Sequence, residues 1–120
     1  MTPEVFHRTA LALTGATFDV KWGVDRTYCV GGKMFAASGP TTDPTPRYSF
    51  KASDMAFETL IEQRLARPTA YSARFKWVTL VSPDALPDDQ ISAYLAQAHA
   101  LVAAKLPKRV RLALGLGLAG

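Results

Sequence analysis

Two adjacent glycines, Gly31 and Gly32, separate two short runs at residues 26–30 and 33–37 that contain aromatic and β-branched residues. Such runs are typical of β-strands. Both glycines tolerate a positive φ, so the pair predicts a tight hairpin between the runs. A similar run at residues 17–21 precedes them and ends near Gly23. The sequence therefore predicts an antiparallel meander in this part of the chain.

Helical patterns lie on both sides of the meander. Thr2 followed by Pro3 predicts a helix start, with a helix that extends to about Leu13. A loop is expected over residues 39–46 and a strand over 47–51, and Ser53 begins a second helix. The strongest strand pattern covers residues 75–81, and a last helix begins at Pro87. The expected order α-β-β-β-β-α-β-α indicates an α+β fold, an antiparallel sheet with helices packed on it.

Length and composition indicate one small globular domain. The chain has 120 residues, of which 48% are hydrophobic and 20% are charged. We expect the domain to cover residues 1–109 and residues 110–120 to form a flexible tail. Cys29 is the single cysteine, which excludes an internal disulfide and is insufficient for a structural zinc site. Without an export signal or a long apolar run, we expect a cytoplasmic monomer that contacts no membrane and holds no cofactor.

The sequence contains no assembled catalytic pattern, so we expect the protein not to be an enzyme. His7 and His99 lie in the first and last expected helices, outside any nucleophile or metal motif, although a pairing of either with Cys29 stays open. The glycine pair with Lys33 matches only a fragment of a phosphate-binding loop, because a strand follows it instead of a helix. Asp88 and Asp89 are explained as acids in the first turn of a helix.

Cations and aromatic residues alternate along several expected strands, and the net charge is +4 with a pI near 9.5. In residues 47–51, Tyr48 and Phe50 are expected to point toward the core while Arg47, Ser49 and Lys51 point toward solvent. Such a face would bind phosphates and stack bases. The alternative is an ordinary solvated sheet face with both tryptophans packed into the core. The candidate nucleic-acid-binding residues are Lys33, Lys51, Arg74 and Lys76, with Arg47 and Trp22 as additions.

The chain also resembles a known family. The matching segments, in family order, are Leu13-x-Gly15, Lys21-Trp22-Gly23, residues 28–36 (YCVGGKMFA), Tyr48-x-Phe50-Lys51-Ala52, Ala70-Tyr71, Lys76-Trp77-Val78 and residues 101–107 (LVAAKLP). Together they resemble the MmcQ/YjbR family of small bacterial proteins. The resemblance implies an α+β fold and DNA binding through a motif similar to a double wing. Ala98-His99 stands where the family often has Ser-Tyr, and the glycine-rich tail after Arg111 has no family counterpart.

Three functions remain open at this point. The first is a non-enzymatic binding module for nucleic acid, with DNA as the expected partner. The second is a protein-interaction or chaperone-like adaptor that uses a sheet edge or the tail to bind a protein partner. The third is a binder of a small molecule or nucleotide, in a cleft between the last helix and the strand that carries Trp77.

Overall fold

The computed structural model describes residues 1–21, 25–40, 45–70 and 73–116, and the structural statements below concern these residues. The helices are α1 (Pro3–Leu11), α2 (Asp54–Glu62), α3 (Asp88–Ala103) and α4 (Lys108–Ala113), with a short 3₁₀ turn, η1 (Ala73–Phe75). The strands are β1 (Ala16–Lys21), β2 (Asp25–Val30), β3 (Lys33–Pro40), β4 (Pro46–Lys51), β5 (Ala66–Pro68) and β6 (Trp77–Leu80). The α+β prediction is confirmed.

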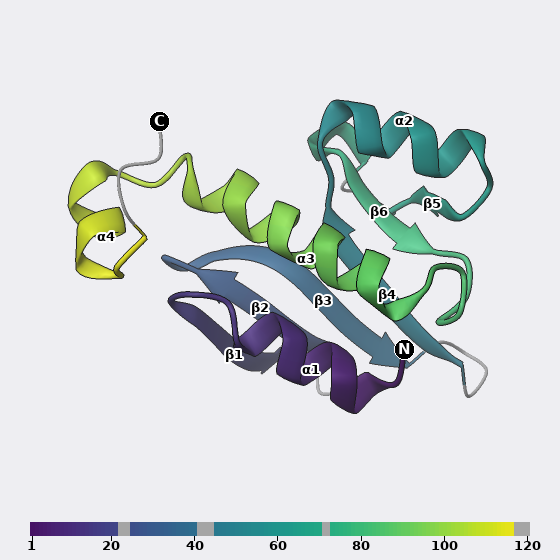
Figure 1. Cartoon of the computed structure of the whole chain (residues 1–120), viewed down its shortest axis with the longest axis horizontal. Helices are drawn as coiled ribbons and strands as arrows, with labels where there is room; N and C mark the ends of the chain where they lie inside the picture. The colour runs from purple at the N-terminus through teal and green to yellow at the C-terminus, as the bar shows by residue number, and fades with distance from the viewer. Residues whose placement is uncertain (22–24, 41–44, 71–72, 117–120) are drawn as a thin grey trace.

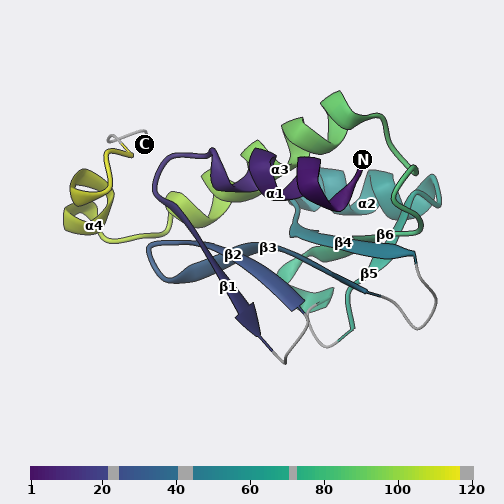
Figure 2. The same cartoon turned by 90° about the horizontal axis from the view of Figure 1, so that it is seen from below.

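The six strands form one antiparallel sheet in the order β1-β2-β3-β4-β6-β5 (Figure 1). Helices α1, α2 and α3 lie on the same side of this sheet, as the second view shows (Figure 2). We call the opposite side the helix-free face. Gly31 and Gly32 adopt positive φ values of 58° and 80° between β2 and β3, which confirms the predicted hairpin.

Side-chain caps explain where the first two helices begin. The hydroxyl of Thr2 accepts a hydrogen bond from the Val5 amide at 3.2 Å, and the hydroxyl of Ser53 accepts one from the Ala56 amide at 3.1 Å. Each bond satisfies an amide that has no partner within the first turn of its helix. The two starts predicted from Thr2 and Ser53 are therefore correct.

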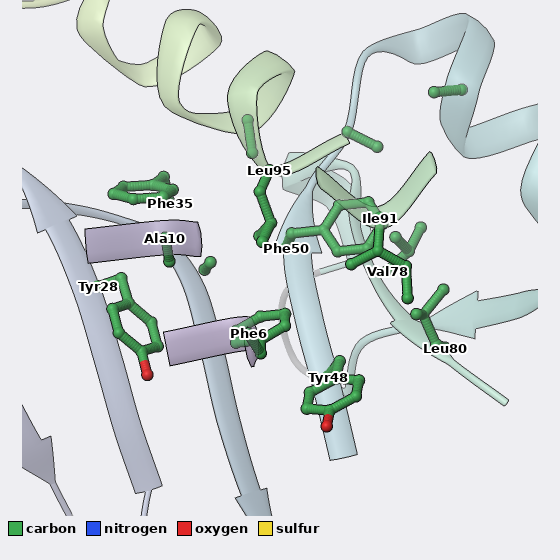
Figure 3. Close-up of a cluster of buried hydrophobic side chains, with 14 of the residues drawn as sticks. Phe6, Ala10, Tyr28, Phe35, Tyr48, Phe50, Val78, Leu80, Ile91 and Leu95 are labelled. Carbon is green, nitrogen blue, oxygen red and sulfur yellow. The ribbon is translucent and has the colours of Figure 1, made fainter. Parts of the chain in front are cut away.

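The core lies between the sheet and the helices α1 and α3 (Figure 3). Phe6 of α1 stacks on Tyr48 of β4, with ring centroids 4.5 Å apart, and meets Tyr28 of β2 edge to face at 5.8 Å. Ile91 and Leu95 of α3 are also fully buried there. This packing anchors the middle strands from one side only, so it fixes the orientation of the side chains on the helix-free face.

Three segments differ from the sequence prediction. Residues 66–68 form the short strand β5, where the sequence analysis expected no strand. The strand expected over 75–81 begins at Trp77, because η1 occupies residues 73–75 and Lys76 has a φ of 63°. Residues 110–113, which were expected to belong to a flexible tail, lie in α4, and Leu114 after this helix packs over Gly15.

Candidate functional site

The strand register separates the predicted cations between two ends of the sheet. Lys33 begins β3, Lys51 ends β4 and Trp77 begins β6, and Lys51 lies directly opposite Trp77. We call this the Lys51 end of the sheet. Arg47 lies near the start of β4, opposite Gly39, at the other end. Arg47 therefore lies apart from Lys33 and Lys51, and these three cations do not form one continuous face.

At the Lys51 end, two cations lie against one exposed aromatic residue. The ammonium of Lys51 donates a hydrogen bond to the carbonyl oxygen of Phe75 at 2.7 Å. The guanidinium carbon of Arg74 lies 4.7 Å from the centroid of the Phe75 ring, within the range of a cation–π contact. The Phe75 residue is 53% exposed, an unusual position for a phenyl ring. We call these three residues the Lys51–Phe75 site.

The surroundings of Lys51 perturb its titration. Partial burial lowers the pKa of the Lys51 ammonium, the charge of Lys105 lowers it further, and Asp54 acts in the opposite direction. Lys105 lies just after α3 and is exposed, so it adds a further cation near the Lys51–Phe75 site. The positive charge of Lys105 disfavours the charged form of Lys51, an effect that a bound anion would relieve.

Lys33 and Lys76 take separate positions. Lys33 is exposed at the hairpin turn of the Lys51 end. The Lys76 ammonium lies 4.9 Å from the centroid of the Phe57 ring in α2, so it is directed to the helix layer. Lys76 therefore does not extend the helix-free face as the strand prediction required.

Arg47 is occupied by an ion pair at the far end. Its Nη2 lies 2.9 Å from Oδ1 of Asp25, which comes from β2, two strands away. Gly39 of β3 lies between them in the register. A Cβ at this position would come within 2.2 Å of the Asp25 oxygen and 2.9 Å of the Arg47 nitrogen, so the ion pair depends on the missing side chain. Trp22, the remaining candidate, lies outside the described residues.

The middle of the helix-free face is buried and lined by hydroxyl groups. The register aligns Thr27, Ala37, Ser49 and Thr79 across four strands. The Thr79 hydroxyl forms hydrogen bonds with those of Ser49 at 2.9 Å and Thr69 at 3.0 Å. Tyr48 and Phe50 are buried as predicted, but Ser49 between them is also buried, although it was expected to contact solvent. Trp77 is also buried, as the alternative of packed tryptophans predicts for this residue.

The histidines and the cysteine form no reactive group among the described residues. His7 Nδ1 shares a hydrogen bond of 2.9 Å with the Tyr28 hydroxyl, and His99 Nε2 bonds the Thr14 carbonyl oxygen at 2.7 Å. Neither of these bonds involves Cys29, and burial raises the pKa of the Cys29 thiol, which disfavours the reactive thiolate. Within the described ranges, no three His, Cys, Asp or Glu side chains are grouped to hold a metal ion. Across the same ranges, no helix has the length and apolar character needed to cross a bilayer.

Sequence reasoning missed Phe75 and Lys105 as parts of this site. Phe75 was expected inside a strand, where its exposure could not be assigned to either face. Lys105 follows α3 and was not among the candidates named from the strands. The available signal was the sequence Arg74-Phe75-Lys76, an aromatic residue between two cations, but only the 3₁₀ turn turns the ring outward.

A model of the YjbR family matches residues 11–101, which cover both the hairpin and the Lys51–Phe75 site. The chain belongs to the YjbR family. A search of the curated proteins finds no match. The family assignment agrees with the resemblance noted in the sequence.

Two solved structures have the same fold as this YjbR chain. The Deinococcus radiodurans protein DR2400, described by the domain name DUF419, aligns with a TM-score of 0.83 and 23% identity, over 99% of this chain and 93% of that one. A Pseudomonas syringae protein, structural genomics target PsR293, aligns with a TM-score of 0.69 and 14% identity, over 85% of this chain and 99% of that one. At these identities the likeness establishes the fold alone.

Proposed function

We propose that this YjbR protein is a non-enzymatic nucleic-acid-binding protein and that the Lys51–Phe75 site belongs to its binding surface. The observation that carries the proposal is the exposed Phe75 ring with Arg74 over it at 4.7 Å and Lys51 bonded to its carbonyl oxygen at 2.7 Å. Exposed aromatic rings stack on bases, and nearby lysines and arginines contact phosphates.

Other charges at the same end of the sheet support the proposal. Lys105 acts electrostatically on Lys51, and Lys33 is exposed at the hairpin turn of this end. The chain as a whole has a net charge of +4, which favours approach to a polyanion. The DNA binding implied by the family resemblance agrees with this partner class.

The geometry also favours one form of nucleic acid. A base can stack on the Phe75 ring only when it is unpaired and accessible, as it is in a single strand. We therefore expect single-stranded oligonucleotides to bind more tightly than a duplex of the same length. Phosphate contacts from Lys51 and Arg74 would hold the backbone beside the stacked base.

Fluorescence anisotropy with labelled single- and double-stranded oligonucleotides at two salt concentrations tests the proposal. Phe75→Ala should weaken binding of the single strand by about 1–3 kcal/mol. Lys51→Gln and Arg74→Gln should each reduce the slope of log K against log salt by about 0.7, the value for one phosphate contact on a single strand. Lack of binding by the wild-type protein at low salt would refute the proposal.

Arg8→Gln is the matched control, because Arg8 is exposed in α1, within the helix layer, and its loss changes the net charge equally. The control should retain most of the affinity. If Arg8→Gln weakened binding as much as Lys51→Gln, the effect would come from net charge and the Lys51–Phe75 site would not be the binding surface.

A further inference from the structure

The two edges of the sheet differ in how they are protected. β5, at one edge, has only three residues and ends in Pro68, which cannot donate a backbone hydrogen bond. β1, at the other edge, has six residues and no proline. Within the described part of the chain, β1 pairs only with β2, which leaves its outer edge open. A strand of this length can pair with a strand from another molecule.

Apolar side chains of β1 remain accessible on the side that faces the helix layer. Phe18 and Val20 are 42% and 49% exposed, although α1 packs against this strand. His7 of α1 touches the Phe18 ring edge to face, at 4.8 Å between centroids, but does not cover it. An added strand opposite Val20 would bury the exposed side chain of this residue.

The helix-free face of β1 carries one acid and one base. Asp19 and Lys21 alternate with Phe18 and Val20, so they project to this face. The charges of Asp19 and Lys21 act in opposite directions on the pKa of Cys29 in the neighbouring strand. Both charges are therefore close to β2 and available at the open edge.

One backbone bond shows which amides face outward. The Val20 amide donates to Oδ1 of Asp19 at 2.8 Å, a side-chain acceptor instead of a carbonyl of β2. Amides along an antiparallel strand alternate in direction, so the Val20 amide lies on the outer edge. In the single chain, Oδ1 of Asp19 accepts the hydrogen bond of the Val20 amide. In a dimer, a carbonyl oxygen of the added strand would be the acceptor instead.

We propose that β1 pairs antiparallel with β1 of a second copy, about a two-fold axis through Val20. In this register Val20 lies opposite the partner's Val20, and Asp19 lies opposite the partner's Lys21, twice by symmetry. An axis through Asp19 would place two carboxylates opposite each other, and an axis through Phe18 would place Asp19 opposite the partner's Thr17 without an ion pair. Charge complementarity selects the Val20 axis.

This inference changes the expectation of a monomer, because exposure of an edge strand cannot be recognised before the strand order is known. Charged residues on an edge strand can also serve only to prevent pairing. The two roles differ in what charge reversal does. If the charges only prevent pairing, the double variant with both charges reversed associates no more strongly than either single variant does.

Sedimentation equilibrium of the full chain at low salt, up to near-millimolar concentration, measures the association. Asp19→Lys and Lys21→Asp should each weaken dimerisation by at least about tenfold, because two attractive pairs per dimer become repulsive. The double variant should recover the wild-type association. Thermal unfolding checks that each variant is folded, since Lys21 also lies opposite Asp25 of β2. A wild-type protein that stays monomeric, or a dimer that is insensitive to both reversals, would overturn the proposal.

Disulfide cross-linking tests the register in a Cys29→Ser background. Val20→Cys should form a covalent dimer on mild oxidation, because opposed residues of paired strands lie within the Cα distance that a disulfide bridges. Phe18→Cys is the matched control and should remain monomeric, since the Val20 axis places the two copies of residue 18 far apart. Cross-linking of the Phe18→Cys protein in preference to Val20→Cys would overturn the proposed axis.

Discussion

Substitution of Gly31 by alanine should destabilise the protein more than the same change at the adjacent Gly32. Both glycines have positive φ values, 58° and 80°, so both substitutions carry a conformational cost. Only at Gly31 does an added Cβ meet other atoms. It would lie 2.6 Å from Cδ1 and 2.8 Å from Cδ2 of Leu106, whereas the Cβ at Gly32 would have nothing within 4 Å.

The expected difference follows from two contributions to the free energy of unfolding. A left-handed backbone costs a residue with a Cβ about 1–2 kcal/mol, so Gly32→Ala should destabilise by roughly that amount. Leu106 is buried, so its methyl groups must repack within the core to make room. Overpacking of this kind adds about 1–3 kcal/mol. We therefore expect Gly31→Ala to cost about 2–5 kcal/mol in total.

Urea denaturation followed by circular dichroism measures both changes, with the midpoints compared at a common m value. Leu106→Ala supplies the decisive control, because it removes the Leu106 atoms that an alanine at position 31 would meet. In that background Gly31→Ala should cost no more than Gly32→Ala does in the wild type. Equal costs at the two glycines, or an unchanged cost of Gly31→Ala beside Leu106→Ala, would refute the reasoning.

Two further substitutions test conformational and electrostatic contributions to stability. Arg64 has a φ of 60° after α2, where the Leu65 amide bonds the Leu60 carbonyl oxygen at 2.9 Å, and α4 has Gly115 in the equivalent position. Arg64→Gly should therefore stabilise by roughly 0.5–1 kcal/mol in urea denaturation, and a loss of stability would contradict this. Burial, with smaller contributions from Asp84, Asp88 and Tyr28, raises the pKa of Tyr48 to about 12 from 10.0. The unfolded chain then ionises first, so stability should fall by about 2–3 kcal/mol between pH 10 and 12. Tyr48→Phe should remove most of this fall, and an unchanged pH dependence would disprove the assignment.

Local signals in the sequence were sufficient for most of the fold. Thr2 and Ser53 mark helix starts because each supplies an oxygen to an unpaired amide, and the glycine pair marks a turn that other residues adopt at a cost. β5 could not be predicted, because its three residues, of which Pro68 is the last, have no strand pattern of their own. That segment is a strand only because the register of β6 places acceptors and donors beside it.

The candidate site was less predictable than the fold. The sequence indicated Lys51 and Arg74, but it placed Arg74 and Lys76 at or in one strand that begins near Phe75. The 3₁₀ turn and the left-handed Lys76 break that pattern, so Arg74 lies over the Phe75 ring while Lys76 lies over the Phe57 ring of α2. The pairing of Arg47 with Asp25 joins strands that are not neighbours, and a pattern within one strand contains no information about it.

The contact across Gly39 has an evolutionary consequence. An acid at position 25, a glycine at position 39 and an arginine at position 47 form a unit, because the ion pair occupies the space that a Cβ at position 39 would fill. Relatives that carry any side chain at position 39 should have lost the acid, the arginine or both. Aligned family sequences should therefore show these three positions changing together, whereas Gly32, which has open space around it, should vary independently of them.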